Sequence, residues 1–182
     1  MHTVKKETVA LDFTSLQGHP PGTISGMLKR SYAEIIASDP SLWEPEIRGW
    51  EEYDREIFRY PETVGNCLFL SWADNALVGF GSFDPRPAPQ FGIIGHHCIL
   101  PEFSSSGYGR QQLLEILRRI QTLKIDKARV STLDHPFFEP ARRLYESLGF
   151  HKTGLKEWHS NTAPLNIIEF EARVSETLKQ KV

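Results

Sequence analysis

Apolar residues follow two periods along this chain, and each period predicts a different kind of secondary structure. Alternation of apolar and polar residues, or a short apolar run, predicts a strand, whereas apolar residues every three or four positions predict a helix. The predicted strands cover residues 9–13, 67–72, 77–83, 91–100, 128–133, 150–159 and 165–174. The predicted helices cover residues 23–38, about 44–60 and 107–124, together with a segment that ends at residue 148.

The predicted element order is β-α-α-β-β-β-α-β-α-β-β. The turn 73–75 between two strands predicts an antiparallel hairpin. A helix between two later strands predicts a parallel crossover. Thr23 is expected to cap the first helix and Gly149 to end the last one. We therefore expect one mixed α/β domain over residues 1–175, followed by a polar, frayed tail over residues 176–182.

Composition narrows the range of partners. The chain has 182 residues and a formal net charge of −2, which gives no electrostatic reason to expect nucleic acid or an anionic membrane surface as partner. No apolar run approaches the roughly 18 residues that span a bilayer, and the first residues lack the apolar core of a signal peptide. A cytoplasmic location is the resulting expectation. The two cysteines, Cys67 and Cys98, lie in predicted strands and are expected to be reduced thiols.

A loop of small residues opens the predicted helix 107–124. It contains Ser104, Ser105, Ser106, Gly107 and Gly109 and directly follows an apolar strand. Backbone N–H groups at the start of a helix have no intrahelical partner, and the positive end of the helix dipole lies there. Such a loop is typical of a phosphate site. The serine hydroxyls add donors, and a glycine at 107 permits close approach.

A second motif follows about forty residues later and completes a family likeness. After the strand, the Ser-rich loop with Gly107-Tyr108-Gly109, the helix and the next strand comes Ala141-x-x-Leu144-Tyr145-x-x-x-Gly149-Phe150. Over roughly residues 66–155, this succession resembles the GNAT superfamily of N-acetyltransferases. The resemblance implies a mostly antiparallel seven-stranded sheet with about four flanking helices, splayed between the fourth and fifth strands. It also implies acetyl-CoA as cosubstrate and no metal.

The resemblance implies a cofactor site along the fourth strand and the loop. In the family, loop amides hold the pyrophosphate and the strand backbone pairs with the pantetheine arm. Two positions depart from the family pattern: Ser104 stands where Arg or Gln is usual, and Phe138 where Asn is common. The residues expected at the cofactor are Cys98, Ile99, Leu100, Ser104, Ser105, Ser106, Gly107, Tyr108, Gly109, Arg110, Phe138 and Ala141.

Acetyl transfer to an amine needs a base for the amine and a proton for the departing thiolate. Tyr145 matches the family tyrosine that donates this proton or orients the thiol, although it would also suit a packing role. His97 is the preferred base, with His96 and ordered water as alternatives, because an imidazole titrates near neutral pH. The two adjacent histidines point to opposite faces of a strand, so one metal ion could not easily use both.

The sequence leaves the acceptor open. The leading hypothesis is an enzyme that moves acetyl to a primary amine of a small molecule or peptide by direct attack in a ternary complex. The alternative is a non-catalytic acyl-CoA-binding sensor, and a homodimer is possible in either case. The residues considered for the acceptor side are aromatic or acidic and also suit core edges or a solvated helix face: Trp43, Glu46, Trp50, Glu51, Glu52, Tyr53, Asp54, Trp72 and Trp158.

Overall fold

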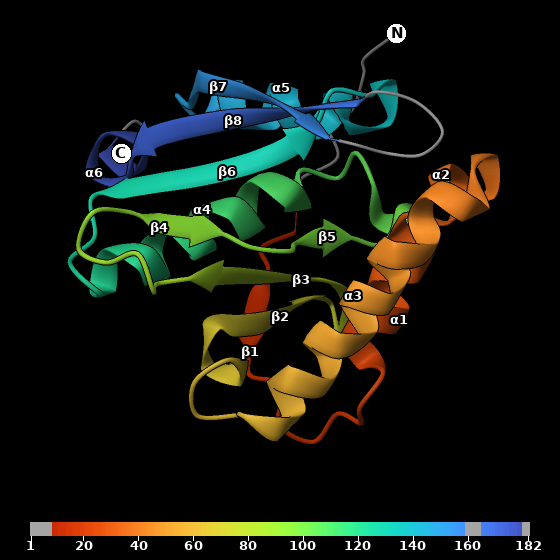
Figure 1. Ribbon diagram of the computed structural model, residues 1–182. Helices are drawn as coiled ribbons and strands as arrows, with labels where there is room; N and C mark the ends of the chain where they lie inside the picture. The colour runs from red at the N-terminus through yellow and green to blue at the C-terminus, as the bar shows by residue number, and fades with distance from the viewer. Residues whose placement is uncertain (1–8, 159–164, 180–182) are drawn as a thin grey trace, which may run out of the picture.

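Helices cover both faces of one twisted sheet in the computed structural model, which describes residues 9–158 and 165–179 (Figure 1). The strands are β1 (Asp12–Thr14), β2 (Leu68–Ala73), β3 (Ala76–Asp84), β4 (Gly92–Ile94), β5 (Cys98–Ile99), β6 (Lys127–Leu133), β7 (His151–Trp158) and β8 (Leu165–Arg173). Their spatial order is β1-β2-β3-β4-β6-β8-β7, with β5 paired to β3. The β4–β6 pair is parallel and the other pairs are antiparallel. The predicted mixed α/β fold is confirmed.

The fourth strand of the predicted sheet is split, and this explains why the sheet has eight strands instead of seven. Gly95, His96 and His97 leave the extended ladder between β4 and β5. Before this break, β4 pairs with the start of β6 at residues 92 and 93. After it, within the described ranges, β5 pairs only with β3 and the end of β6 pairs only with β8. The sheet is therefore open between β5 and β6, as the family resemblance implies (Figure 1).

The helices agree with the predicted ones in place but differ at their ends. They are α1 (Thr23–Ser31), α2 (Ala33–Ser38), α3 (Pro40–Arg59), α4 (Tyr108–Thr122), α5 (Glu139–Ser147) and α6 (Val174–Lys179), with short 3-10 turns η1 (Gly65–Cys67), η2 (Pro101–Phe103) and η3 (Pro136–Phe138). The first predicted helix is interrupted at Tyr32, and its N-cap is Gly22 instead of Thr23. Part of the tail that was expected to fray, residues 176–179, instead lies in α6, and residues 180–182 lie outside the described part of the chain.

Two buried clusters lie on opposite faces of the sheet, because successive strand residues point to opposite sides. Phe69 packs with residues of α4 and α5, whereas Leu68 and Leu70 pack with residues of α1 and α3. Asp54 of α3 joins α1 to this second layer. Its carboxylate accepts hydrogen bonds from the N–H groups of Gly22, Ile24 and Ser25 at 2.6, 2.8 and 3.0 Å. Asp54 was expected on a solvated helix face, but it is only 2% exposed and caps the neighbouring helix α1.

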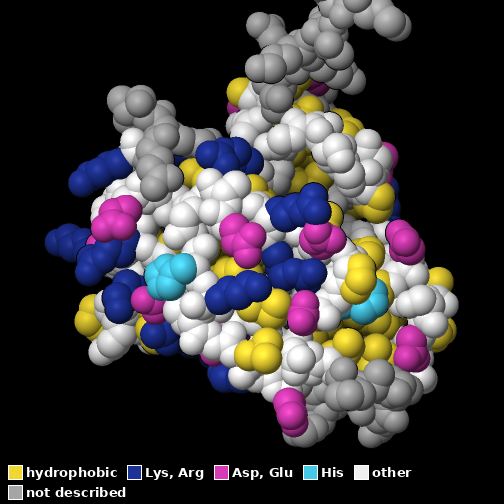
Figure 2. Space-filling model, turned by 90° about the horizontal axis from the view of Figure 1, so that it is seen from above, with side chains coloured by type: hydrophobic (Ala, Val, Ile, Leu, Met, Phe, Trp, Pro, Cys, Tyr) yellow, Lys and Arg dark blue, Asp and Glu magenta, His cyan; other side chains and the backbone are white. Residues whose placement is uncertain are grey.

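The surface carries mixed charge. Basic and acidic side chains are interspersed on the face shown in Figure 2. Several of them form ion pairs across strands, among them Lys156 with Glu169 and Arg129 with Glu171. None of the helices within residues 9–158 and 165–179 combines the length and the apolar character that crossing a bilayer requires.

Candidate active site

Two cavities lie beside the opening of the sheet and share part of their walls. The first, of about 280 Å³, is lined by the loop before α4, by β5 and by the start of α5. The second, of about 240 Å³, lies between α1 and α3 on one side and β6 on the other. Tyr32 and Phe138 line both cavities. A donor and an acceptor bound in the two cavities would therefore meet at these shared residues.

The loop before α4 presents unpaired amides to the first cavity. Ser105 and Gly107 adopt the left-handed conformation, with φ of 61° and 77°, and Gly107 is the N-cap of α4 without a capping side chain. Within the described part of the chain, no N–H group of residues 105–110 donates a backbone hydrogen bond, and the next one, Gln111, donates to the carbonyl of Gly107. Six adjacent free donors at a helix N-terminus suit a diphosphate group.

Most of the predicted cofactor residues meet at this first cavity. Those among its lining residues are Cys98, Ile99, Ser104, Ser105, Gly107, Tyr108, Gly109, Phe138 and Ala141. Three others lie elsewhere. Leu100 is buried at 3% exposure, the Ser106 hydroxyl donates to the Ser104 carbonyl at 3.5 Å, and the Arg110 guanidinium donates to the Ser147 hydroxyl at 3.1 Å. Burial raises the pKa of the Cys98 thiol to about 11, so this cavity residue is a neutral thiol at pH 7.

His97 and Tyr145 form a hydrogen-bonded pair next to the first cavity. The His97 Nε2 and Tyr145 Oη atoms are 2.9 Å apart, and His97 itself lines the cavity. Burial, with a smaller contribution from His96, lowers the pKa of His97 to about 4. Burial also raises the pKa of Tyr145 well above its ordinary value. At neutral pH the imidazole is therefore neutral and the phenol protonated, as a donor–acceptor pair requires.

Gln112 anchors this region from α4, and the sequence analysis did not single it out. Its side chain is fully buried, and its Nε2 donates to the Ser71 hydroxyl at 2.9 Å and to the Cys98 carbonyl at 3.3 Å. Its position four residues before Ile116 places it on the buried face of the helix, which is the signal that could have identified it. Gln112 thus ties β2 and β5 to the helix that follows the loop.

His96 faces the second cavity, opposite to His97. Its carbonyl accepts a hydrogen bond from the Ser82 hydroxyl at 2.7 Å, and its ring lies 5.4 Å from the Tyr53 ring. Partial burial lowers the pKa of the His96 imidazole below its ordinary value, because it removes water from the charged form, while the rest of the side chain stays exposed. The two adjacent histidines are therefore divided between the two cavities.

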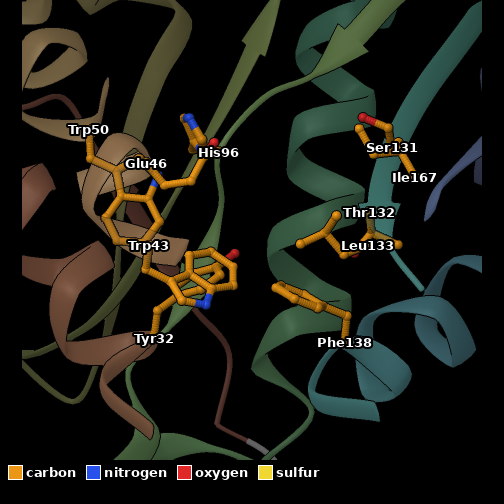
Figure 3. Close-up of a pocket in the computed structure, with 10 residues that line it drawn as sticks. All are labelled: Tyr32, Trp43, Glu46, Trp50, His96, Ser131, Thr132, Leu133, Phe138 and Ile167. Carbon is orange, nitrogen blue, oxygen red and sulfur yellow. The ribbon is translucent and has the colours of Figure 1, made fainter. Parts of the chain in front are cut away.

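The second cavity is largely aromatic on its helical side. Figure 3 shows Tyr32, Trp43 and Trp50 on one side, facing Leu133 and Phe138 on the other. The ring of Tyr32 lies 5.1 Å from that of Trp50 and 5.9 Å from that of Trp43. The sequence analysis missed Tyr32, because its helical spacing is equally typical of a core residue.

Of the other residues considered for the acceptor side, Glu46 lies at the second cavity, and Glu51, Glu52 and Trp72 make contacts elsewhere. Glu46 lines the second cavity, and burial raises the pKa of its carboxyl. Glu51 pairs with Lys29 and Glu52 with Arg55. The Trp72 indole N–H donates to the Thr14 hydroxyl at 2.9 Å, and the side chain of Trp158 lies outside the described part of the chain. Among residues 9–158 and 165–179, no group of three or more His, Cys, Asp or Glu side chains is placed to hold a metal ion.

Residues 31–150 match the model of the acetyltransferase (GNAT) family, which is more than half of the chain. The protein therefore belongs to the GNAT family of acetyltransferases. The predicted family and the predicted enzyme class, an acyltransferase, are both confirmed. Acetyl-CoA is the acyl donor of this family, and the loop of unpaired amides suits its diphosphate.

Solved structures show the same fold at low sequence identity. A GNAT-family acetyltransferase from Desulfovibrio desulfuricans has a TM-score of 0.67 and 18% identity, over 91% of this chain and 99% of that chain. The acetyltransferase yncA from Salmonella typhimurium, solved with its cofactor acetyl-CoA, has a TM-score of 0.65 and 11% identity, over 91% and 94%. The ribosomal-protein-S18-alanine N-acetyltransferase from Escherichia coli has a TM-score of 0.62 and 13% identity, over 90% of this chain and 94% of that chain. No curated protein sequence matches the chain.

Proposed function

We propose that the protein transfers the acetyl group of acetyl-CoA to a primary amine, by direct attack of the amine within a ternary complex. The observation that best supports this proposal is the placement of two cavities with a shared wall at Tyr32 and Phe138, with one histidine facing each cavity. A direct transfer needs both substrates bound at once with their reacting groups adjacent. Two adjoining cavities meet that requirement.

The first cavity suits acetyl-CoA. The free amides of residues 105–110 would hold the diphosphate. The edge of β5 that faces away from β3 has no strand partner among the described residues, and it would pair with the pantetheine arm. Acetyl-CoA supplies the activated thioester. The backbone provides most of these donors, so the replacement of the usual Arg or Gln by Ser104 removes a side chain without removing the amides.

Proton transfer is assigned to two side chains, His96 and Tyr145. His96 lines the second cavity, which we assign to the amine and call the acceptor cavity, and burial lowers the pKa of its imidazole below the ordinary value. We therefore assign to His96 the proton that the ammonium group loses before attack. This assignment departs from the preference for His97 drawn from the sequence. Tyr145, held by His97, is assigned as the acid that protonates the thiolate when the carbon–sulfur bond breaks and the carbon–nitrogen bond forms.

The test is a measurement of binding followed by turnover. Calorimetry with acetyl-CoA should show one site per chain, and a panel of primary amines should release free CoA as the acetylated amine accumulates. Binding without release of CoA for any amine would favour the non-catalytic sensor, and absence of binding would overturn the proposal. The cytoplasmic location, a homodimer, and the domain limit at residue 175 stay predictions.

A further inference from the structure

One face of α3 lines two neighbouring cavities. Trp43, Glu46, Trp50, Tyr53 and Glu56 follow one another at intervals of three or four residues, which places them on one side of the helix. The first three line the acceptor cavity. Tyr53 and Glu56 line a further cavity of about 450 Å³. One face of α3 thus forms part of the wall of both cavities.

His96 joins these two cavities. It is a lining residue of both, and its ring lies 5.4 Å from that of Tyr53 at the middle of the α3 face. The residue proposed to deprotonate the acceptor therefore stands where the acceptor cavity and the further cavity meet. A molecule whose amine reaches the shared wall at Tyr32 can extend past His96 into the larger space.

The acceptor cavity suits an ammonium group. Among the described residues that line it, Glu46 is the only carboxylate and none is Lys or Arg. Within the described residues, Glu46 forms no ion pair. Trp43, Trp50 and Tyr32 add aromatic rings, to which cations are attracted. A half-buried carboxylate without a cationic partner, beside three electron-rich rings, is the environment that a positively charged ligand completes.

The further cavity suits an uncharged, apolar group. Val64, Cys67, Phe83 and Pro85 form much of its lining. The Arg86 guanidinium donates to both carboxylate oxygens of Asp84 at 2.6 to 3.0 Å, which neutralises this pair. Glu56, the other carboxylate of the lining, is exposed to solvent, whereas Glu46 is half-buried. Among the described residues that line it, the further cavity therefore has no half-buried carboxylate without an ion pair.

We propose that the acceptor is a primary amine on an elongated apolar body, such as an arylalkylamine. Its ammonium group binds between Glu46 and the rings of Tyr32 and Trp50, and its body runs along α3 past His96 into the cavity beside Cys67. This inference rests on the proposed function, since it names the acceptor class of the same reaction. A polyamine is the competing acceptor class and serves as one arm of the test.

The first experiment compares propylamine, phenylbutylamine and spermidine as acceptors at saturating acetyl-CoA. Burial of a phenyl group and an extra methylene predicts a kcat/KM for phenylbutylamine about 100-fold above that for propylamine. Equal values for the two monoamines, or a higher value for spermidine, would overturn the inference while leaving acetyl transfer itself intact. Absence of turnover with every amine, despite acetyl-CoA binding, would overturn the proposed function and with it the inference.

The second experiment separates the two ends of the acceptor. Glu46→Gln should lower kcat/KM for phenylbutylamine about 30-fold, mainly through KM, because a partly buried charge partner is lost. Glu44→Gln is the matched control on the same helix, since Glu44 is exposed and pairs with Arg48. Cys67→Phe should lower the preference for phenylbutylamine over propylamine at least tenfold, whereas Cys67→Ala should keep it. An unchanged preference in Cys67→Phe, or an unchanged KM in Glu46→Gln, would refute the assignment of that end.

Discussion

Replacing Tyr145 with Phe removes a single oxygen atom from the centre of the proposed site. In the described structure, this hydroxyl has one hydrogen-bond partner, His97 Nε2 at 2.9 Å. The ring keeps its neighbours, because its centroid lies 6.0 Å from that of Phe150 and 5.7 Å from that of Phe170, and neither contact involves the hydroxyl. We therefore expect Tyr145→Phe to fold and to lose about 1 kcal/mol of stability, the net value of one neutral hydrogen bond.

The expected effect on catalysis is much larger than this effect on stability. A positioned general acid contributes about 10²- to 10⁴-fold, so kcat should fall at least about 100-fold, which corresponds to about 2.7 kcal/mol of transition-state stabilisation. Affinity for acetyl-CoA should stay within about twofold of the original, because the loop amides that are proposed to hold the diphosphate do not contact Tyr145. The contrast between an unchanged affinity and a low kcat is the specific signature of a catalytic phenol.

Three measurements test this expectation together. A thiol reagent follows the release of CoA, calorimetry gives the affinity for acetyl-CoA, and thermal melting confirms folding. Tyr60→Phe is the matched control, since Tyr60 is 47% exposed and lies outside both cavities of the site. A double-mutant cycle with His97→Gln should show strongly non-additive losses, because both residues belong to one hydrogen-bonded pair. A kcat for Tyr145→Phe within threefold of the original protein would assign Tyr145 to packing alone.

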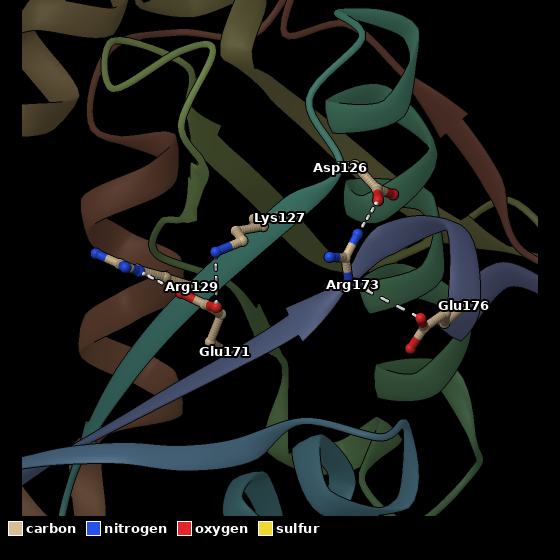
Figure 4. Close-up of polar contacts among 6 residues, drawn as sticks. All are labelled: Asp126, Lys127, Arg129, Glu171, Arg173 and Glu176. Atoms are coloured by element: carbon tan, nitrogen blue, oxygen red, sulfur yellow. Dashed lines mark hydrogen bonds and ion pairs between the residues drawn. The ribbon is translucent and has the colours of Figure 1, made fainter.

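Four further outcomes follow from individual contacts. Gly107→Val places a β-branched residue at φ 77° and should weaken acetyl-CoA binding at least tenfold by calorimetry, with a lower melting temperature. Asp54→Ala leaves three N–H groups at the start of α1 without their acceptor and should lower the free energy of unfolding in urea by about 3 kcal/mol, whereas a loss below 1 kcal/mol would contradict the capping role. The pKa of His97 is lowered from 6.5 to about 4, so as the pH falls the unfolded chain takes up a proton at this residue before the folded chain does. The free energy of unfolding should therefore decrease as the pH is lowered from 6.5 to 4, by about 3 kcal/mol more than in His97→Gln. Asp126→Asn should lower the free energy of unfolding in urea by about 1 kcal/mol, because the carboxylate of Asp126 accepts a hydrogen bond from the first turn of α6 and pairs with Arg173 (Figure 4). Equal stability of the variant and the original protein at high pH would refute that role.

Local patterns allowed the sequence to predict the loop and the motif tyrosine. Gly107 and Tyr145 belong to short motifs whose geometry depends on neighbouring residues in the chain. The roles of Asp54 and Tyr32, in contrast, depend on how the helices pack together. Asp54 has the spacing of a solvated helix face, and only the docking of α1 against α3 buries it. Tyr32 has the spacing of a core residue, and its position between two cavities depends on packing among α1, α3 and η3, which no local pattern encodes.

The histidines show how a correct local rule can still leave the assignment of roles open. Strand alternation correctly places His96 and His97 on opposite sides of the chain. It does not indicate that the strand is interrupted at these residues, or that a separate cavity lies on each side. The sequence analysis preferred His97 as the base and kept His96 and ordered water as alternatives. In the folded chain His97 is hydrogen-bonded to Tyr145, and His96 is the one that faces the cavity proposed to bind the acceptor.

The break in the fourth strand links the fold to the proposed chemistry. Gly79 of β3 lets β5 approach closely, since a Cβ atom there would lie 2.1 Å from the Cys98 carbonyl oxygen. β5 is thereby held against β3 on one edge, and no strand of the described structure pairs with its other edge, where β6 pairs with β8 instead. The three residues of the break, Gly95 to His97, supply one imidazole to each cavity. A continuous strand would pair with β6 along its full length, which would close the opening and remove the unpaired edge. The same irregularity therefore provides the backbone groups that are proposed to bind the donor and the two imidazoles that line the two cavities.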